Sequence, residues 1–185
     1  NIWYINDLHH ILEAIALKTG QSIADIGAGG GYFSLQFAEM VGRKGKVYAV
    51  DTNPEFLEFI KNSTKEKKLD NVITILATED RLNLLEKSLD FIFMRNVTHH
   101  ISNRVKYFRN LKDLLKPDGK IIVIEYKKGK FFTFRGMFGH DVPKEIIIRE
   151  MKEAGYLLEK DFNFLPEQRF AIYIYKGVKD DDRGQ

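Results

Sequence analysis

The sequence predicts an α/β fold: a doubly wound, mostly parallel sheet of seven strands, with one antiparallel strand in a C-terminal hairpin. Two observations predict it. Short apolar runs rich in Ile, Val and Phe alternate along the chain with segments whose apolar residues have helical spacing. The short runs are apolar throughout, which is typical of strands buried on both faces of a parallel sheet. Repeated strand–helix–strand units of this kind form right-handed crossovers, so the chain should wind a Rossmann-like sheet.

The expected elements follow in chain order. A first helix should contain Leu8–Ile15, with Asn6-Asp7 as its cap. Five buried strands are expected at Ile23–Ile26, Val47–Val50, Val72–Leu76, Leu89–Met94 and Ile121–Ile124. Helical stripes lie between them at Phe33–Val41, Phe56–Ile60 and Val105–Leu115, and Pro117-Asp118-Gly119 predicts a turn after the third stripe.

The C-terminal part departs from this alternation. A helix should follow Pro143 and end near Gly155. Two strand-like runs come next, Leu157–Phe164 and Phe170–Tyr175, and no helical pattern separates them. They predict a hairpin, so we expect one edge strand to run antiparallel.

Composition limits the class of protein. A chain of 185 residues with 44 % hydrophobic residues is long enough for one domain, 1–185, with a real core. The absence of Cys excludes disulfides, cysteine-ligated metal centres and thiol nucleophiles.

No apolar run approaches the ~20 residues that span a bilayer, so no membrane span is expected. No signal peptide is visible, which favours a cytoplasmic protein. The net charge of +3 comes from interspersed charges without a basic stripe, so a nucleic-acid partner is not expected.

A glycine-rich loop follows the first expected strand. The segment Asp25–Gly31 reads Asp-Ile-Gly-Ala-Gly-Gly-Gly and runs directly into a helix, so its backbone N–H groups can meet an anion. The dinucleotide fingerprint requires a glycine at position 32, where Tyr32 stands; we expect its side chain to prevent close packing of helix on strand. Asp51 ends the second strand, where a carboxylate can accept hydrogen bonds from both hydroxyls of a ribose.

With these motifs the chain resembles the class I S-adenosylmethionine-dependent methyltransferases, from about Gln21 to Lys176. Asp25–Gly31 is similar to the first motif of that family, Ala77–Asp80 to the loop beside the adenine, Leu89–Met94 to the fourth motif and Leu115–Lys120 to the turn before the fifth strand. The resemblance implies S-adenosyl-L-methionine as the cofactor, with its carboxylate on the loop and its positive end near Asp25. The implied cofactor-binding residues are Asp25, Gly27, Ala28, Gly29, Gly31, Asp51, Thr52, Thr78, Glu79, Asp80, Arg95 and Asn96.

The segment after the fourth strand should face both cofactor and acceptor. Arg95–Thr98 resembles the C-methyltransferases of ubiquinone and menaquinone synthesis, whereas His99-His100-Ile101 is similar to the wider small-molecule group. His99 and His100 are candidates for a general base or a substrate-orienting donor, with helix capping as the alternative. Adjacent histidines point in different directions, so we expect no metal site. The Asn/Asp-Pro-Pro-aromatic tetrapeptide of amine methylation is missing here, which counts against adenine or glutamine as acceptor.

Two segments are candidates for closing the cleft. The stretch 126–142 carries Phe131, Phe132, Phe134 and Phe138, and is expected either to cover the sheet end or to act as a mobile lid over an apolar acceptor. The N-terminal helix, within 1–20, should lie over the same cleft, and Trp3 and Tyr4, ahead of that helix, are candidates for closing the cleft from the other side.

The sequence therefore favours methyl transfer to a small acceptor, apolar or aromatic. The alternatives are an RNA or protein methyltransferase and a non-catalytic protein that binds the cofactor. The oligomeric state is not predicted.

Overall fold

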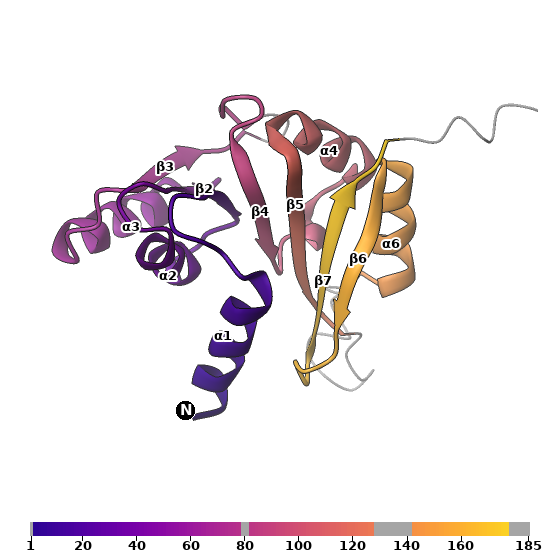
Figure 1. Cartoon of the computed structure of the whole chain (residues 1–185), viewed down its shortest axis with the longest axis horizontal. Helices are drawn as coiled ribbons and strands as arrows, with labels where there is room; N and C mark the ends of the chain where they lie inside the picture. The colour runs from indigo at the N-terminus through magenta and orange to yellow at the C-terminus, as the bar shows by residue number, and fades with distance from the viewer. Residues whose placement is uncertain (1, 79–81, 128–141, 178–185) are drawn as a thin grey trace, which may run out of the picture.

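Seven strands form one sheet in the part of the chain that the computed structural model describes, residues 2–78, 82–127 and 142–177, with the backbone alone for residues 2–6. They are β1 (Ser22–Ile26), β2 (Lys46–Asp51), β3 (Val72–Leu76), β4 (Leu89–Arg95), β5 (Leu115–Tyr126), β6 (Tyr156–Phe162) and β7 (Gln168–Tyr175). Their order across the sheet is β3-β2-β1-β4-β5-β7-β6 (Figure 1). The first five pair in parallel and β7 runs antiparallel to both of its neighbours, which confirms the predicted fold class.

The position of the antiparallel strand differs from the expectation. β7 lies between β5 and β6, so the edge strand is β6 and the prediction of an antiparallel edge strand was wrong. The reason is burial: the middle of β7 is buried at every residue from Phe170 to Tyr173, whereas most of β6 is exposed. The more apolar strand takes the interior place in the sheet because both of its faces are then covered.

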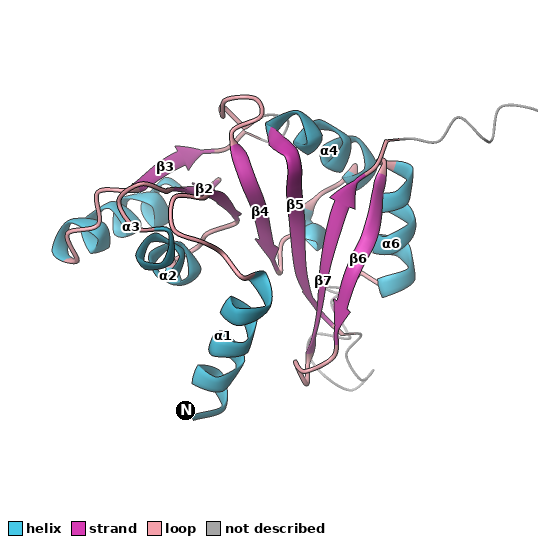
Figure 2. Ribbon diagram, in the orientation of Figure 1, coloured by secondary structure: helices cyan, strands magenta, loops and turns pink. Residues whose placement is uncertain are grey.

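Helices cover both faces of the sheet (Figure 2). They are α1 (Ile2–Ile15), α2 (Tyr32–Val41), α3 (Pro54–Glu66), α4 (Arg104–Leu111) and α6 (Lys144–Glu153), with single 3-10 turns at Thr98–His100 and Lys112–Leu114. α1 and α2 pack on Ile23 and Val47, and α3 packs on Ala49, which shares the face of Val47 because side chains alternate along a strand. α4 and α6 pack on the opposite face.

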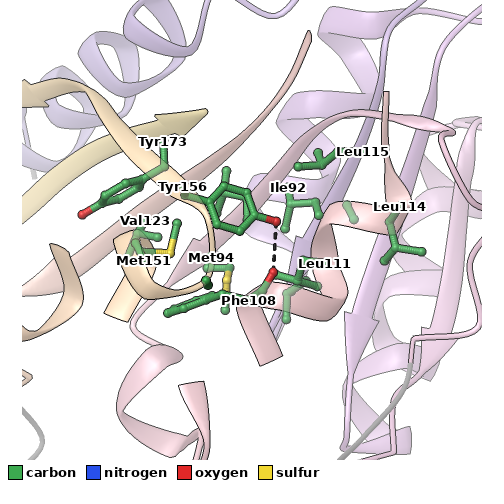
Figure 3. Packing of buried hydrophobic residues seen from close by; sticks show 14 of the residues in the cluster. Ile92, Met94, Phe108, Leu111, Leu114, Leu115, Val123, Met151, Tyr156 and Tyr173 are labelled. Carbon is green, nitrogen blue, oxygen red and sulfur yellow. Dashed lines mark hydrogen bonds between the residues drawn. The ribbon is translucent and has the colours of Figure 1, made fainter. Parts of the chain in front are cut away.

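The core on the α4–α6 side contains aliphatic and aromatic side chains of β4, β5, β7 and both helices (Figure 3). The Tyr156 hydroxyl lies among them and donates to the Phe108 carbonyl at 3.0 Å, so its burial leaves no unpaired hydroxyl. On the other face the rings of Phe33, Phe37 and Phe93 lie within 4.9–5.9 Å of one another. They join α2 to β4 and thereby fix the start of α2 relative to the end of β4.

Two expected boundaries shift. Asn6 and Asp7 lie inside α1 rather than at its cap, because the apolar residues before them extend the helix to Ile2. Leu115 begins β5 instead of ending a helix, and Pro117-Asp118-Gly119 forms an irregularity within β5 rather than a turn before it: the register passes from Leu89–Leu115 to Phe91–Lys120. Proline is tolerated in such a bulge because it has no N–H to contribute to the ladder.

Within the residues described, no helix is both long and apolar enough to cross a membrane.

Candidate active site

The glycine loop joins β1 to α2 with three glycines in the left-handed region, Gly27, Gly29 and Gly31, at φ 73°, 52° and 77°. A Cβ added at Gly27 would lie 2.3 Å from Val97 Cγ2, and one at Gly31 would lie 2.6 Å from Ile60 Cγ1. A Cβ added at Gly29 would meet nothing within 4 Å. Two of the glycines therefore allow close packing of the loop, while the third leaves an open side that a ligand can approach.

Asp51, at the end of β2, lies beside that open glycine. Its Oδ2 accepts from the Gly29 N–H at 2.8 Å, and its Oδ1 accepts from the Asn53 N–H at 2.9 Å. A carboxylate oxygen can accept more than one hydrogen bond, so both oxygens can still accept from the hydroxyls of a ligand. Asn53 in turn caps α3 by accepting from the Glu55 N–H. The structure thus brings together two of the residues that the sequence predicted to bind the cofactor.

Asp25 lies beneath the loop, only 3 % exposed. Its Oδ2 accepts from the Ser34 hydroxyl at 2.6 Å, which ties β1 to α2. Burial raises the pKa of the Asp25 carboxyl to about 6, although the hydrogen bonds from Ser34 act in the opposite direction. A contact of Asp25 with the positive end of the cofactor stays a prediction.

The side chain of Tyr32 does not have the effect that the sequence suggested. Tyr32 is the first residue of α2 and is 43 % exposed, with its ring edge-on to that of Phe33. The Tyr32 side chain is not held between helix and strand. The argument that this side chain excludes a dinucleotide by preventing close packing of helix on strand was therefore wrong in its physical reason.

Beyond β1, the end of β4 is held by a residue of β7. Gln168, 6 % exposed, donates from Nε2 to Asn96 Oδ1 at 2.8 Å, and its Oε1 accepts from Arg95 Nη2 at 2.8 Å. The Arg95 guanidinium also lies 5.0 Å from the centroid of the Phe33 ring. Asn96 has a positive φ of 55°, which asparagine adopts more readily than most residues. Gln168 therefore fixes both polar side chains at this strand end.

Glu125, near the end of β5 and 4 % exposed, organises the next turn. Its Oε1 accepts from the Val97 N–H at 2.9 Å, the Thr98 N–H at 2.6 Å and the Thr98 hydroxyl at 2.7 Å. Its Oε2 lies 3.3 Å from Nδ1 of His99, whose side chain is 10 % exposed. His100 is exposed, and its ring centroid lies 4.1 Å from that of His99. The two candidate histidines thus have different surroundings.

Sequence reasoning missed Glu125, Gln168 and Ser34. Glu125 had a usable signal, since it is an acid that closes a buried strand, as Asp51 does. Gln168 had none, because its place at this edge depends on the pairing of Gln168 with Tyr126. Ser34 lies within α2, where a serine has many ordinary roles.

The other predicted residues lie around the same edge or outside the described chain. Thr52 is exposed beside Asp51, and Ala28 packs against the α3 cluster. Thr78 is exposed two residues beyond β3, next to Ala77, whose N–H donates to the Asp51 carbonyl at 2.9 Å. Glu79, Asp80 and the stretch 128–141, which is most of the expected lid, lie outside the described residues.

The N-terminal helix reaches this end of the sheet through His10. Its ring centroid lies 5.6 Å from that of Phe164, in the connection between β6 and β7. The side chains of Trp3 and Tyr4 lie outside the described part. Closure of the cleft by this helix stays a prediction.

Two further features bear on what the site can hold. Among the described residues no three His, Asp or Glu side chains are grouped to bind a metal ion. A surface hollow lined by Asp90, Lys116 and Glu159 lies at the opposite, amino end of the strands. The candidate site is therefore defined by backbone geometry and buried polar contacts rather than by the size of a hollow.

Comparison with known proteins agrees with this geometry. Residues 17–163 match the family model described as "Methyltransferase domain". The ubiquinone/menaquinone biosynthesis C-methyltransferase UbiE of Shewanella sp. (strain W3-18-1) is 25 % identical over 157 residues; the match covers 81 % of this chain and 62 % of that protein. The chain thus spans less than two thirds of the length of this curated relative.

Solved structures show the same fold. A S-adenosylmethionine-dependent methyltransferase from Aquifex aeolicus superposes with a TM-score of 0.81 at 25 % identity, covering 90 % of this chain and 89 % of that one. A putative type 11 methyltransferase from Sulfolobus solfataricus gives a TM-score of 0.68 at 24 % identity, with 86 % of each chain covered. Because the family model matches most of the sequence, the chain belongs to the methyltransferase-domain family, in the class I group whose cofactor is S-adenosyl-L-methionine.

Proposed function

We propose that the chain transfers a methyl group from S-adenosylmethionine to a small apolar or aromatic acceptor at the carboxyl ends of β1, β2 and β4. The observation that carries the proposal is the open side of Gly29 next to the Asp51 carboxylate. It supports binding of a ligand that lies against the backbone of the loop at Gly29 and places a ribose beside the Asp51 carboxylate. The cofactor, when bound, supplies an electrophilic methyl group on a positively charged sulfur.

The residues of the chain then have separate tasks. In this proposal the glycine loop binds the methionine portion, and Asp51 accepts hydrogen bonds from the ribose hydroxyls. Asp25 holds α2 in place through Ser34 and adds negative charge near the positive end of the cofactor. Orientation of the acceptor behind the methyl group can contribute up to ~7–11 kcal/mol to lowering the barrier, so a rigid loop matters more than many reactive side chains.

The proposed acceptor class rests on two supports. The named function of the Shewanella relative is C-methylation in quinone biosynthesis, and Arg95–Thr98 resembles the segment of that group. The described edge also combines buried apolar surface with a few buried polar groups, which is the usual make-up of small-molecule sites.

The test measures cofactor affinity by calorimetry with S-adenosylmethionine and S-adenosylhomocysteine. A hydrogen bond to a charged group contributes about 1.5–3 kcal/mol, so Asp51→Ala should weaken binding roughly ten- to a hundredfold. Gly29→Ala should weaken it further, because its new methyl group occupies the space that the ligand needs.

The matched control for the glycine is Gly20→Ala. Gly20 also has a left-handed φ, of 86°, and an open Cβ position whose nearest atom lies 3.9 Å away, but it precedes β1 at the other end of the strand. Gly20→Ala should carry the same backbone strain and leave cofactor affinity unchanged. Equal losses in both variants, or wild-type affinity in Gly29→Ala, would contradict the assignment of the site.

A further inference from the structure

β3 and β6 are the two edge strands of the sheet and lie on its opposite sides (Figure 1). An edge strand has a row of backbone N–H and C=O groups that its own sheet does not pair, so another strand can join there unless the edge is protected. We propose that β3 pairs with the β3 of a second copy of this chain, antiparallel and with two-fold symmetry, so that the two sheets become continuous. This assembly does not depend on which acceptor the chain methylates.

β6 carries two features that protect an edge strand. Its register against β7 passes from Leu158 to Lys160 and skips Glu159, which is the mark of a bulge. A bulge bends the strand and twists its edge away from an incoming strand. The middle of β6 is also charged, with Glu159, Lys160 and Asp161 in succession. A strand that added to β6 would meet charged side chains on a bent edge.

β3 has neither of these features. Its residues, Val72–Leu76, pair with β2 in an unbroken parallel register, and none of them is charged. Ile73 is 38 % exposed and Leu76 is 58 % exposed. These two side chains lie on opposite faces of the strand, because side chains alternate along it. A regular, uncharged edge with exposed apolar side chains on both faces favours association with another strand.

The ladder between β2 and β3 shows which backbone groups of β3 are open. The Ala77 N–H donates to the Asp51 carbonyl at 2.9 Å, so the backbone groups of Ala77 face β2. Because these groups alternate in direction along a strand, the N–H and C=O groups of Val72, Thr74 and Leu76 face away from β2. Among the described residues, no other segment hydrogen-bonds to these outward groups. They are available to a strand that arrives from outside.

One register pairs all of these outward groups. With Thr74 opposite its own counterpart on the two-fold axis, Val72 lies opposite Leu76, and every outward N–H meets an outward C=O of the other strand. A shift by one residue would place outward groups opposite inward ones, and a shift by two would leave an end of each strand unpaired. The direction of the backbone groups therefore selects the symmetric pairing.

The side chains are compatible with this register. On one face Ile73 would lie opposite Ile75, which packs against the core on the α4–α6 side. On the other face Leu76 would lie opposite Val72, which packs against the α3 cluster. The two Thr74 side chains would meet on the axis, and a Thr–Thr pair is among the favourable cross-strand pairs. The exposed parts of Ile73 and Leu76 would both be covered.

The absence of charge favours a second copy as the occupant. A different protein is commonly selected by charges that complement those of the edge, and residues 71–78 offer none. A two-fold dimer requires instead that a surface match itself, because the same residues meet across the axis. An uncharged strand meets this requirement without bringing like charges together.

The first experiment measures the mass of the chain by sedimentation over a range of concentrations. We expect the wild type to form a dimer that dissociates on dilution. Ile73→Lys should raise the dissociation constant at least about a hundredfold, because both copies carry the substitution and each loses the burial of an apolar side chain. Leu158→Lys on β6 is the matched control, since Leu158 is also 38 % exposed on an edge strand, and it should leave the constant unchanged.

Three outcomes of this experiment would overturn the proposal: a wild type that stays monomeric up to its solubility limit, a dimer that Ile73→Lys retains, and equal weakening by Leu158→Lys. A second variant guards against a folding defect in Ile73→Lys. Thr74→Pro removes an outward N–H that the β2–β3 ladder does not use, so the sheet keeps its own hydrogen bonds while the edge can no longer pair. It should unfold cooperatively and be monomeric.

The second experiment tests the register and uses the absence of Cys from the chain. Thr74→Cys places two thiols across the axis, where opposite Cα atoms are about 5.5 Å apart, within the span of a disulfide. Mild oxidation should therefore link this variant into a covalent dimer. Ile73→Cys should not link, because its two thiols would be diagonal neighbours about 7–8 Å apart. Failure of Thr74→Cys to link, or equal linking of both variants, would overturn the proposal.

Discussion

The carboxyl ends of β1 and β2 and the carboxyl ends of β4 and β5 lie on one edge of the sheet but are built differently. At β1 and β2, backbone conformation dominates: left-handed glycines shape the loop, and Asp51 binds backbone N–H groups. At β4 and β5, buried side chains dominate, with Gln168 and Glu125 holding the residues that follow β4. A loop built from glycine backbone leaves room for a ligand, whereas a site built from buried side chains selects one chemistry.

The two regions also differ in the ligand that each is proposed to bind, which is the cofactor at β1 and β2 and the acceptor at β4 and β5. The same cofactor suits many methyltransferases, so a backbone cradle can recur with little change. The acceptor differs from enzyme to enzyme, and in the proposed function the residues that face it come from strands that lie far apart in the sequence. Substitutions in the two regions should therefore have different consequences, and those consequences test the comparison.

The largest effect is expected at Gly27, where the two regions meet. Gly27→Ala introduces a Cβ 2.3 Å from Val97 Cγ2 in a residue with φ 73°. Overpacking against a β-branched side chain and a left-handed alanine should together lower the free energy of unfolding by about 2–5 kcal/mol. Urea unfolding measures it. The control Gly20→Ala also has a left-handed backbone but no close contact, and its free energy of unfolding should fall by only about 1–2 kcal/mol. Equal losses in the two variants would show that the Val97 side chain moves aside, and that its contact with Gly27 does not hold the two regions together.

A smaller loss is expected from Gln168→Leu in the side-chain region. The substitution removes the acceptor of Arg95 Nη2 and the donor to Asn96 Oδ1, both partly buried, and should cost about 2–3 kcal/mol. Chemical unfolding, with Gln36→Leu on α2 as the matched control, measures this cost. Cofactor affinity should fall as well if Arg95 and Asn96 bind the cofactor. An unfolding midpoint equal to that of the control would mean that β7 does not support this strand end.

Asp25→Asn, beneath the glycine loop, is expected to raise the free energy of unfolding, whereas the two preceding substitutions lower it. Burial raises the pKa of Asp25 from its ordinary 3.8 to about 6, so the folded protein binds a proton more tightly than the unfolded chain does. The free energy of unfolding of the wild type should therefore fall as pH rises from about 4 to about 6 and stay low above that range. Asparagine removes the buried charge and can still accept from Ser34, so the variant should be more stable at pH 8 by about 1–3 kcal/mol.

The pH dependence provides the check on Asp25. Thermal unfolding should give Asp25→Asn a higher melting temperature than the wild type at pH 8. Near pH 4 the two melting temperatures should be equal. A variant less stable than the wild type at pH 8 would mean that the charged hydrogen bond to Ser34 outweighs the cost of burying the carboxylate. The gain in stability should be accompanied by weaker cofactor binding, a common relation at functional sites.

Most of the fold was predictable because its signals are local. The five apolar runs became β1 to β5, and the stripes between them became α2, α3 and α4. The start of α1 was not predictable from its polar pair, since Asn6 and Asp7 fit a cap and a helix interior alike. The place of β7 was not predictable either, because a hairpin defines the pairing of its two strands but not which of them joins the existing sheet.

The candidate site divides in the same way. Gly29 and Asp51 were predicted to share a site because a glycine loop and a strand-ending acid are recognisable in short segments, and the structure places them in contact. The partnership of Asn96 with Gln168 joins residues 72 positions apart, and that of His99 with Glu125 joins residues 26 apart. Such pairs depend on strand order and register, which periodicity alone does not specify.

The insertion of β7 between β5 and β6 has a consequence for how the protein is made. During synthesis the segment of β6 emerges before β7 and has no place in the sheet until β7 has paired with β5. Domains assemble from the N-terminus as the ribosome delivers them. The glycine loop can therefore take shape while the end of β4 still lacks Gln168, so a nascent chain should acquire affinity for its cofactor before it acquires a finished reaction centre.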